Sequence, residues 1–76
     1  MSRHTARSAT KPKLSLDYGY DEPLQHFFFT VLRGPKVIDS DEMSGCGART
    51  LLAKADEYGM ALPAEHRAAL MLDLPV

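Results

Sequence analysis

Three consecutive phenylalanines, Phe27, Phe28 and Phe29, constrain the fold of this chain more than any other feature. Side chains alternate between the two faces of a β-strand, so the ring of Phe28 must point away from the rings of Phe27 and Phe29. A chain of 76 residues covers only one face of a small sheet well, since it buries roughly 60–65% of the surface of its unfolded state. The sequence therefore predicts that one set of rings builds the core and the other meets a partner or the surface.

Alternating and periodic apolar positions predict the remaining elements. Residues 13–18 and 26–33 have the pattern of strands, and residues 36–39 are a weaker third candidate. Residues 48–58 and 63–74 carry apolar side chains at helical spacing. The predicted fold class is α+β: a small antiparallel sheet of two to three strands, order β-β-β-α-α, with two helices packed on one face. The expected core residues are Leu14, Leu16, Phe27, Phe29, Val31, Leu51, Leu52, Ala55 and Leu70.

The basic residues are unevenly distributed along the chain. Residues 1–13 contain four of the nine and no acidic residue, which leaves five basic and ten acidic residues in 14–76. Residues 1–11 lack apolar periodicity and are predicted to form a disordered basic arm, with residues 12–76 as a single α+β domain. Such an arm suits a nucleic-acid-associated regulator that touches phosphates, although four charges are few for that purpose. The candidate phosphate contacts are Arg3, Arg7, Lys11 and Lys13.

A small enzyme that uses Cys46 is a second alternative. Cys46 lies between two glycines just before a predicted helix, where free N–H groups and the helix dipole favour an anion and lower the pKa of a thiol. A cysteine nucleophile also needs a base, which His26 or His66 would have to supply. Ser44 or Gly45 as an ordinary helix cap explains the same loop. The sequence therefore favours a structural thiol and assigns no catalytic residue.

Several classes of protein are disfavoured by composition. A single cysteine precludes an intramolecular disulfide and fits a reducing compartment. The three histidines are far apart and have no cysteine neighbours, so neither a metal nor another cofactor is expected. No segment approaches the ~20 apolar residues of a membrane span, and the first ten residues lack the apolar stretch of a signal peptide. The expected location is the cytoplasm, without membrane contact.

The favoured interpretation is a small non-enzymatic interaction or regulatory module that binds another protein, or a second copy of itself as a homodimer. Aromatic side chains are enriched in the cores of such interfaces. Phe28 and Leu32 are predicted to lie on the outer face of the sheet, with Tyr20 at its rim and acidic loops that tune orientation and association rate. The predicted partner-binding residues are Tyr20, Phe28, Leu32, Asp21 and Glu22.

Overall fold

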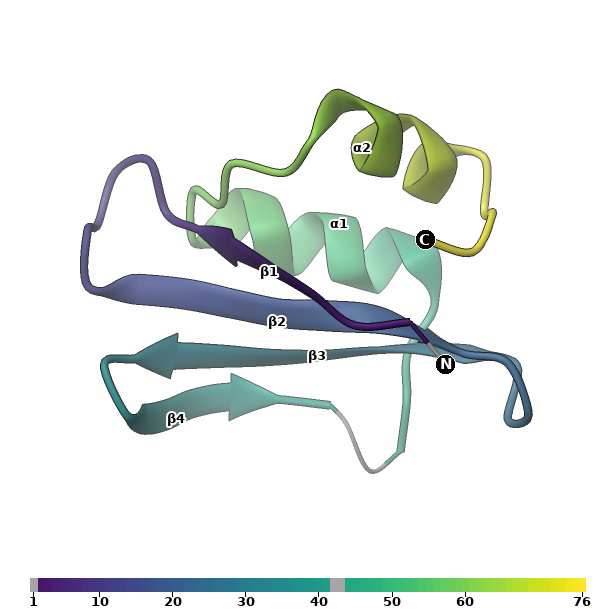
Figure 1. The fold of residues 1–76 in the computed structure, drawn as a ribbon, viewed down its shortest axis with the longest axis horizontal. Helices are drawn as coiled ribbons and strands as arrows, with labels where there is room; N and C mark the ends of the chain where they lie inside the picture. The colour runs from purple at the N-terminus through teal and green to yellow at the C-terminus, as the bar shows by residue number, and fades with distance from the viewer. Residues whose placement is uncertain (1, 42–43) are drawn as a thin grey trace.

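The computed structural model describes residues 2–41 and 44–76 and contains a four-stranded sheet and two helices (Figure 1). The strands are antiparallel and lie in the order β1-β2-β3-β4, so each strand pairs with its neighbour in the sequence. The elements are β1 (His4–Arg7), β2 (Leu14–Asp21), β3 (His26–Arg33), β4 (Lys36–Ser40), α1 (Ala48–Glu57) and α2 (Ala64–Met71). The α+β class is therefore confirmed, but the sheet has four strands rather than two to three.

The central strands β2 and β3 form where polar and apolar residues alternate. Leu16 pairs with Val31 and Tyr18 pairs with Phe29, which places these four apolar side chains on one face of the sheet. The turn after β3 is tight because Gly34 adopts a φ of 59°, a left-handed conformation that favours glycine. This turn brings β4 back beside β3.

β1 differs from the disordered arm expected for residues 1–11. Its four residues pair with β2, and Ala6 is buried in the core. Its outer edge is also hydrogen-bonded, because the backbone N–H of Ala61 donates to the carbonyl oxygen of Arg7. Main-chain hydrogen bonds on both edges order this segment although it has few apolar side chains, so an apolar pattern could not reveal it. The folded unit therefore begins before residue 12.

The hydrophobic core lies between the sheet and the helices. Phe27 and Phe29 belong to it as expected, and α1 contributes Leu51 and Ala55. Of the nine predicted core residues only Leu52 is partly rather than fully buried. The buried cluster consists of Ala6, Leu14, Leu16, Tyr18, Phe27, Phe29, Val31, Ala48, Leu51, Ala55, Met60 and Leu70. The apolar periodicity of the sequence therefore predicts the core well.

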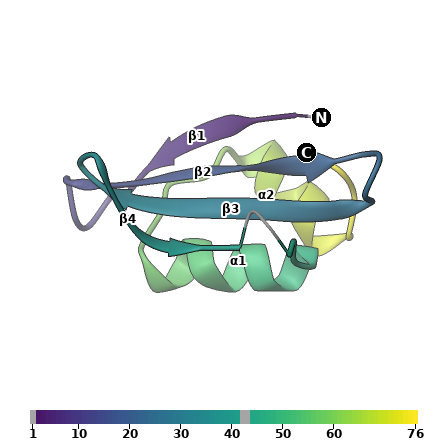
Figure 2. The same cartoon turned by 90° about the horizontal axis from the view of Figure 1, so that it is seen from below.

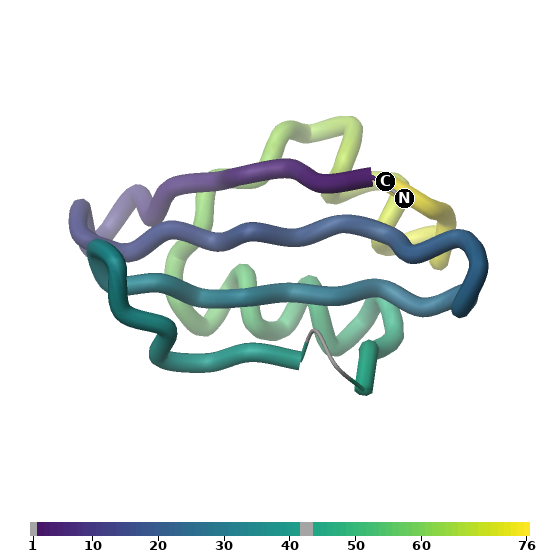
Figure 3. The backbone as a smooth tube through the Cα atoms, turned by 60° about the horizontal axis from the view of Figure 1, so that its bottom comes forward, coloured from purple at the N-terminus to yellow at the C-terminus, as the bar shows by residue number. Residues whose placement is uncertain are grey.

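The opposite face of the sheet is covered by no helix of the described chain. Figure 2 shows α1 and α2 on the same side of the strands, and Figure 3 shows the four strands side by side in front of the helices. Alternate positions of β1, β2 and β3 therefore point away from the core, and an irregularity in the pairing of β3 with β4 places Val37 and Ser40 on the same side. We call this surface the open face; its positions are Thr5, Arg7, Ser15, Asp17, Gly19, Phe28, Thr30, Leu32, Val37 and Ser40.

Candidate functional site

Phe28, on which the predicted partner site depends, lies on the open face but is only 4% exposed. Its neighbour across β2 is Gly19, which leaves room for the ring: a Cβ atom at Gly19 would lie 2.7 Å from Phe28 Cζ. The guanidinium of Arg3 lies over the ring, with its Cζ 4.9 Å from the ring centroid, in a cation–π contact. The expectation that Phe28 offers an exposed contact is therefore wrong, because Gly19 and Arg3 enclose the ring on the uncovered side of the sheet.

The centre of the open face is polar. Thr5 Oγ1 donates to Asp17 Oδ1 at 3.0 Å, and the hydroxyl oxygens of Thr30 and Ser40 are 3.2 Å apart. The strand register places these four side chains in one row across β1, β2, β3 and β4. Because of this polar row, the open face lacks the apolar centre that is typical of protein–protein interfaces.

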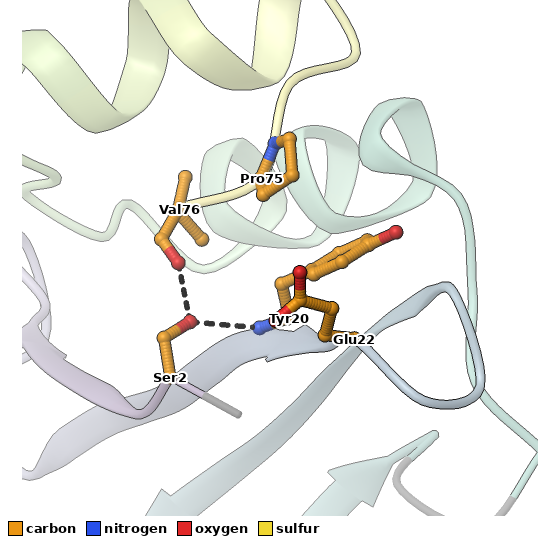
Figure 4. Close-up of a pocket in the computed structure, with 5 residues that line it drawn as sticks. All are labelled: Ser2, Tyr20, Glu22, Pro75 and Val76. Atoms are coloured by element: carbon orange, nitrogen blue, oxygen red, sulfur yellow. Dashed lines mark hydrogen bonds between the residues drawn. The ribbon is translucent and has the colours of Figure 1, made fainter.

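Tyr20 lies on the other face of the sheet from Phe28. It pairs with Phe27, and the two rings meet edge to face with centroids 5.0 Å apart. The backbone N–H of Tyr20 donates to Ser2 Oγ, which donates to the carbonyl oxygen of Val76 (Figure 4). Tyr20, Ser2 and Val76 help to line a pocket of about 300 Å³. The prediction that Tyr20 borders the outer face is therefore wrong.

The acidic partner candidates are also separated from the apolar ones. Asp21 ends β2 and is partly buried, while Glu22 is exposed in the turn that follows. Leu32, partly buried on the open face, pairs with Ser15 near the opposite end of the sheet. The structure therefore does not bring the predicted partner-binding residues together in one patch.

Five exposed cations gather at the end of the sheet that holds the β1–β2 and β3–β4 turns, on the left in Figure 1. Arg7 ends β1, and Arg33 at the end of β3 pairs with Lys36 at the start of β4. Lys11 and Lys13 lie in the connection between β1 and β2. We call Arg7, Lys11, Lys13, Arg33 and Lys36 the basic end.

No ion pair neutralises the basic end within the described part of the chain. The acidic residues of β4 and α1 are paired with helix cations instead. Lys54 Nζ lies 2.9 Å from Asp39 Oδ2 and 3.5 Å from Glu57 Oε1, and Arg67 lies 2.9 Å from Asp56 Oδ1. The hydrogen bond from Lys54 also lowers the pKa of Asp39, so this carboxylate is ionised and matched at neutral pH. The basic end therefore presents positive charge to solvent that no carboxylate of the described residues pairs with.

A pocket of about 420 Å³ opens within the basic end. Three of its lining side chains are cationic, and the apolar part includes the buried Leu14. It is lined by Thr10, Lys11, Pro12, Lys13, Leu14 and Arg33. The pocket therefore combines a mainly apolar lining with three cationic side chains.

Arg33 and Lys36 are the residues of this surface that sequence reasoning missed. The four basic residues of positions 1–13 form a group in the sequence because they are close together, whereas Arg33 and Lys36 come from a later hairpin. Antiparallel pairing of β2 with β3 places the end of β3 beside the start of β2, so the two hairpin turns meet. Arg3 does not belong to the basic end, because its guanidinium packs on the ring of Phe28. The basic end could have been predicted from the register of the strands, but not from the density of charge along the chain.

Cys46 is held in backbone pairing with β3 and is not arranged as a nucleophile. Its N–H donates to the carbonyl oxygen of Phe27 at 2.8 Å, and the N–H of Phe27 donates back at 3.0 Å. Burial, with a smaller contribution from the charge of Asp41, raises the pKa of the Cys46 thiol to about 11. No hydrogen bond joins this thiol to His26 or His66 within the described chain. The thiol is therefore protonated at neutral pH, which argues against cysteine catalysis.

Alkylation should reveal this protonated thiol. In the folded protein, the rate of iodoacetamide modification of Cys46 should keep rising to about pH 11, because only the thiolate reacts. The same chain unfolded in urea should titrate near the ordinary value of about 8.5. At pH 7, we therefore expect modification of the folded protein to be more than about tenfold slower than modification of the unfolded chain. A rate plateau below pH 8 in the folded protein would contradict this picture.

The side chain of His66 packs against the rings of Tyr18 and His4. Its Nδ1 lies 2.5 Å from the hydroxyl of Tyr18, and its ring centroid is 4.3 Å from that of His4. Burial raises the pKa of Tyr18, so the phenol keeps its proton. These three rings tie α2 to β1 and β2, which leaves His66 as a packing residue rather than a base for Cys46.

Comparison with known proteins gives no relatives: no family model, no curated protein and no solved structure matches this chain. Neither helix of the described chain is long and apolar enough to cross a bilayer. Within the described residues no group of three or more histidine, cysteine, aspartate or glutamate side chains is placed to hold a metal ion. Function therefore has to be argued from the surface itself.

Proposed function

We propose that this protein is a small non-catalytic module that binds nucleic acid through phosphate contacts at the basic end. The observation that supports the proposal is the gathering of five exposed cations from three segments without an ion pair among the described residues. Lysine and arginine side chains that replace condensed counterions supply most of the affinity in sequence-independent binding. With about five phosphate contacts, binding is weak and depends steeply on salt.

A duplex is the better partner for this surface than a single strand. Proteins that bind single strands stack successive bases on exposed aromatic side chains. None of the six aromatic residues here is fully exposed, since four are buried and Tyr20 and Tyr58 are partly buried. Contacts to the phosphate backbone carry no direct sequence information, so the proposed binding has little sequence preference.

The alternatives have weaker support. A protein-binding sheet face would depend on Phe28, which is buried, and an enzyme would depend on Cys46, which is protonated at neutral pH. A lone free thiol is compatible with a reducing compartment, and we include a cytoplasmic location in the proposal.

Salt dependence of binding is the direct test. We expect a labelled duplex of mixed sequence to bind with a slope of log K against log salt of about −4 to −5, as for five neutralised phosphates. The double variant Arg33→Gln/Lys36→Gln should reduce the magnitude of this slope by about two. These two residues lie outside the N-terminal segment, so the variant separates a binding surface assembled by the fold from a basic arm. Fluorescence anisotropy between 50 and 200 mM salt measures both quantities.

Arg67→Gln is the matched control, because Arg67 is also a cation but is already paired with Asp56. It should leave the slope unchanged. Circular dichroism and thermal unfolding establish that each variant is folded. A slope that Arg33→Gln/Lys36→Gln does not alter would contradict the proposed surface, as would binding that differs more than tenfold between two unrelated duplex sequences.

A further inference from the structure

The C-terminal end of α2 exposes an unusual amount of apolar surface. Met71 is 72% exposed, Leu72 70% and Leu74 50%. This segment is ordered by main-chain hydrogen bonds, since the N–H of Leu74 donates to the carbonyl oxygen of Ala69 at 2.8 Å. Asp73 between them adopts a φ of 59°, the left-handed conformation that often ends a helix. The apolar side chains are therefore displayed by a fixed turn.

A hollow of about 450 Å³ lies directly beside these side chains. It is formed where the first residues of α1 meet the last residues of α2. It is lined by Gly47, Ala48, Arg49, Leu70, Met71, Leu72 and Asp73. Met71 and Leu72 thus present exposed apolar side chains on the wall of a concave site.

The charges around the hollow are self-complementary. Arg49 and Asp73 are both exposed, and neither takes part in an ion pair within the described chain. A surface with charge of only one sign would favour a partner of the opposite charge. This surface carries one cation and one acid beside exposed apolar side chains, so its charges can pair with those of a second copy of the same surface. In a two-fold interface, residue i of one copy meets residue j of the other, and j meets i.

We infer that this face forms a two-fold symmetric homodimer. Met71 and Leu72 of each copy enter the hollow of the other copy, and Arg49 of each copy pairs with Asp73 of the other. Cys46, just before α1, is paired with Phe27 at the start of β3, so the dimer face lies at the opposite end of the molecule from the basic end. The inference does not depend on the proposed function, because the two surfaces share no residue.

Sedimentation equilibrium of the full chain tests the dimer. The 8.4 kDa protein should show a concentration-dependent mass that approaches twice this value. Leu72→Asp should abolish self-association. Leu24→Asp, which changes an exposed leucine in the β2–β3 turn, should leave it intact. A wild-type protein that remains monomeric at millimolar concentration would overturn the inference, as would a dimer that survives Leu72→Asp.

Charge reversal tests the pairing across the two-fold axis. Arg49→Asp and Asp73→Arg alone should each weaken self-association about tenfold or more, because each homodimer then places two like-charged pairs in contact. An equimolar mixture of the two variants should recover it, since their heterodimer restores both opposite-charge pairs. Thermal unfolding checks that Asp73→Arg is folded despite the positive φ. Failure of the mixture to recover would overturn the proposed pairing.

Discussion

Phe29→Ala should lower the free energy of unfolding by about 3–5 kcal/mol, the usual range for removing a buried phenylalanine ring. Phe29 is 2% exposed and pairs with Tyr18 in the centre of the sheet, on the face that packs against the helices. A domain of 76 residues has a total stability of about 4–11 kcal/mol, so this change should remove a large fraction of the free energy of unfolding. Urea denaturation followed by circular dichroism measures the loss as a lower midpoint at constant slope.

Val37→Ala provides the matched control for this prediction. Val37 lies on β4 with 54% of its surface exposed, so its truncation should change stability by less than about 0.5 kcal/mol. A loss below about 1 kcal/mol for Phe29→Ala would mean that the Phe29 ring is not buried in the core. The contrast between the two residues therefore tests the burial that the structure assigns to them.

The period-2 pattern of β3 predicted correctly which phenylalanines face the helices, but it could not predict exposure on the other face. Exposure of Phe28 depends on two residues that are distant in sequence: Gly19 on β2 and Arg3 just before β1. Neither contact is encoded in the local pattern, because the first requires the register of β2 with β3 and the second requires the pairing of β1 with β2. Periodicity determines the direction of a side chain, whereas neighbours that are distant in sequence determine its burial.

The same reasoning explains the basic end. Local composition predicts phosphate contacts at Arg3, Arg7, Lys11 and Lys13 but assigns them to a disordered arm and the residues next to it. β1 is stabilised by backbone pairing, for which a sequence gives little signal when few of the side chains are apolar. Once β1 and the β3–β4 turn are positioned, Arg33 and Lys36 join the group. Charge clusters assembled by strand pairing are therefore invisible to a linear reading of charge.

Phe28→Asp is expected to destabilise the monomer by about 3–5 kcal/mol rather than to act on binding alone. Removing the ring leaves a cavity beside Gly19 and the backbone carbonyl of Ser2, because glycine has no side chain that could fill the space. The new carboxylate is poorly hydrated in that space, although the guanidinium of Arg3 offsets part of this penalty. Urea denaturation measures the effect, and nucleic-acid binding by the fraction that remains folded should keep its salt slope, since Phe28 is outside the basic end.

Leu32→Asp places the same charge four residues along β3 on the same face and is the control. Leu32 is only partly buried beside the exposed Val37, so the loss should be about 1 kcal/mol. If Phe28→Asp is as mild as Leu32→Asp, the Phe28 ring is accessible in solution and the open face regains its aromatic contact. If Phe28→Asp is much the more severe, the uncovered side of the sheet contains a small second packing site built by Gly19, Phe28 and Arg3. In that case, the N-terminal segment contributes to stability through Arg3 as well as through the backbone hydrogen bonds of β1.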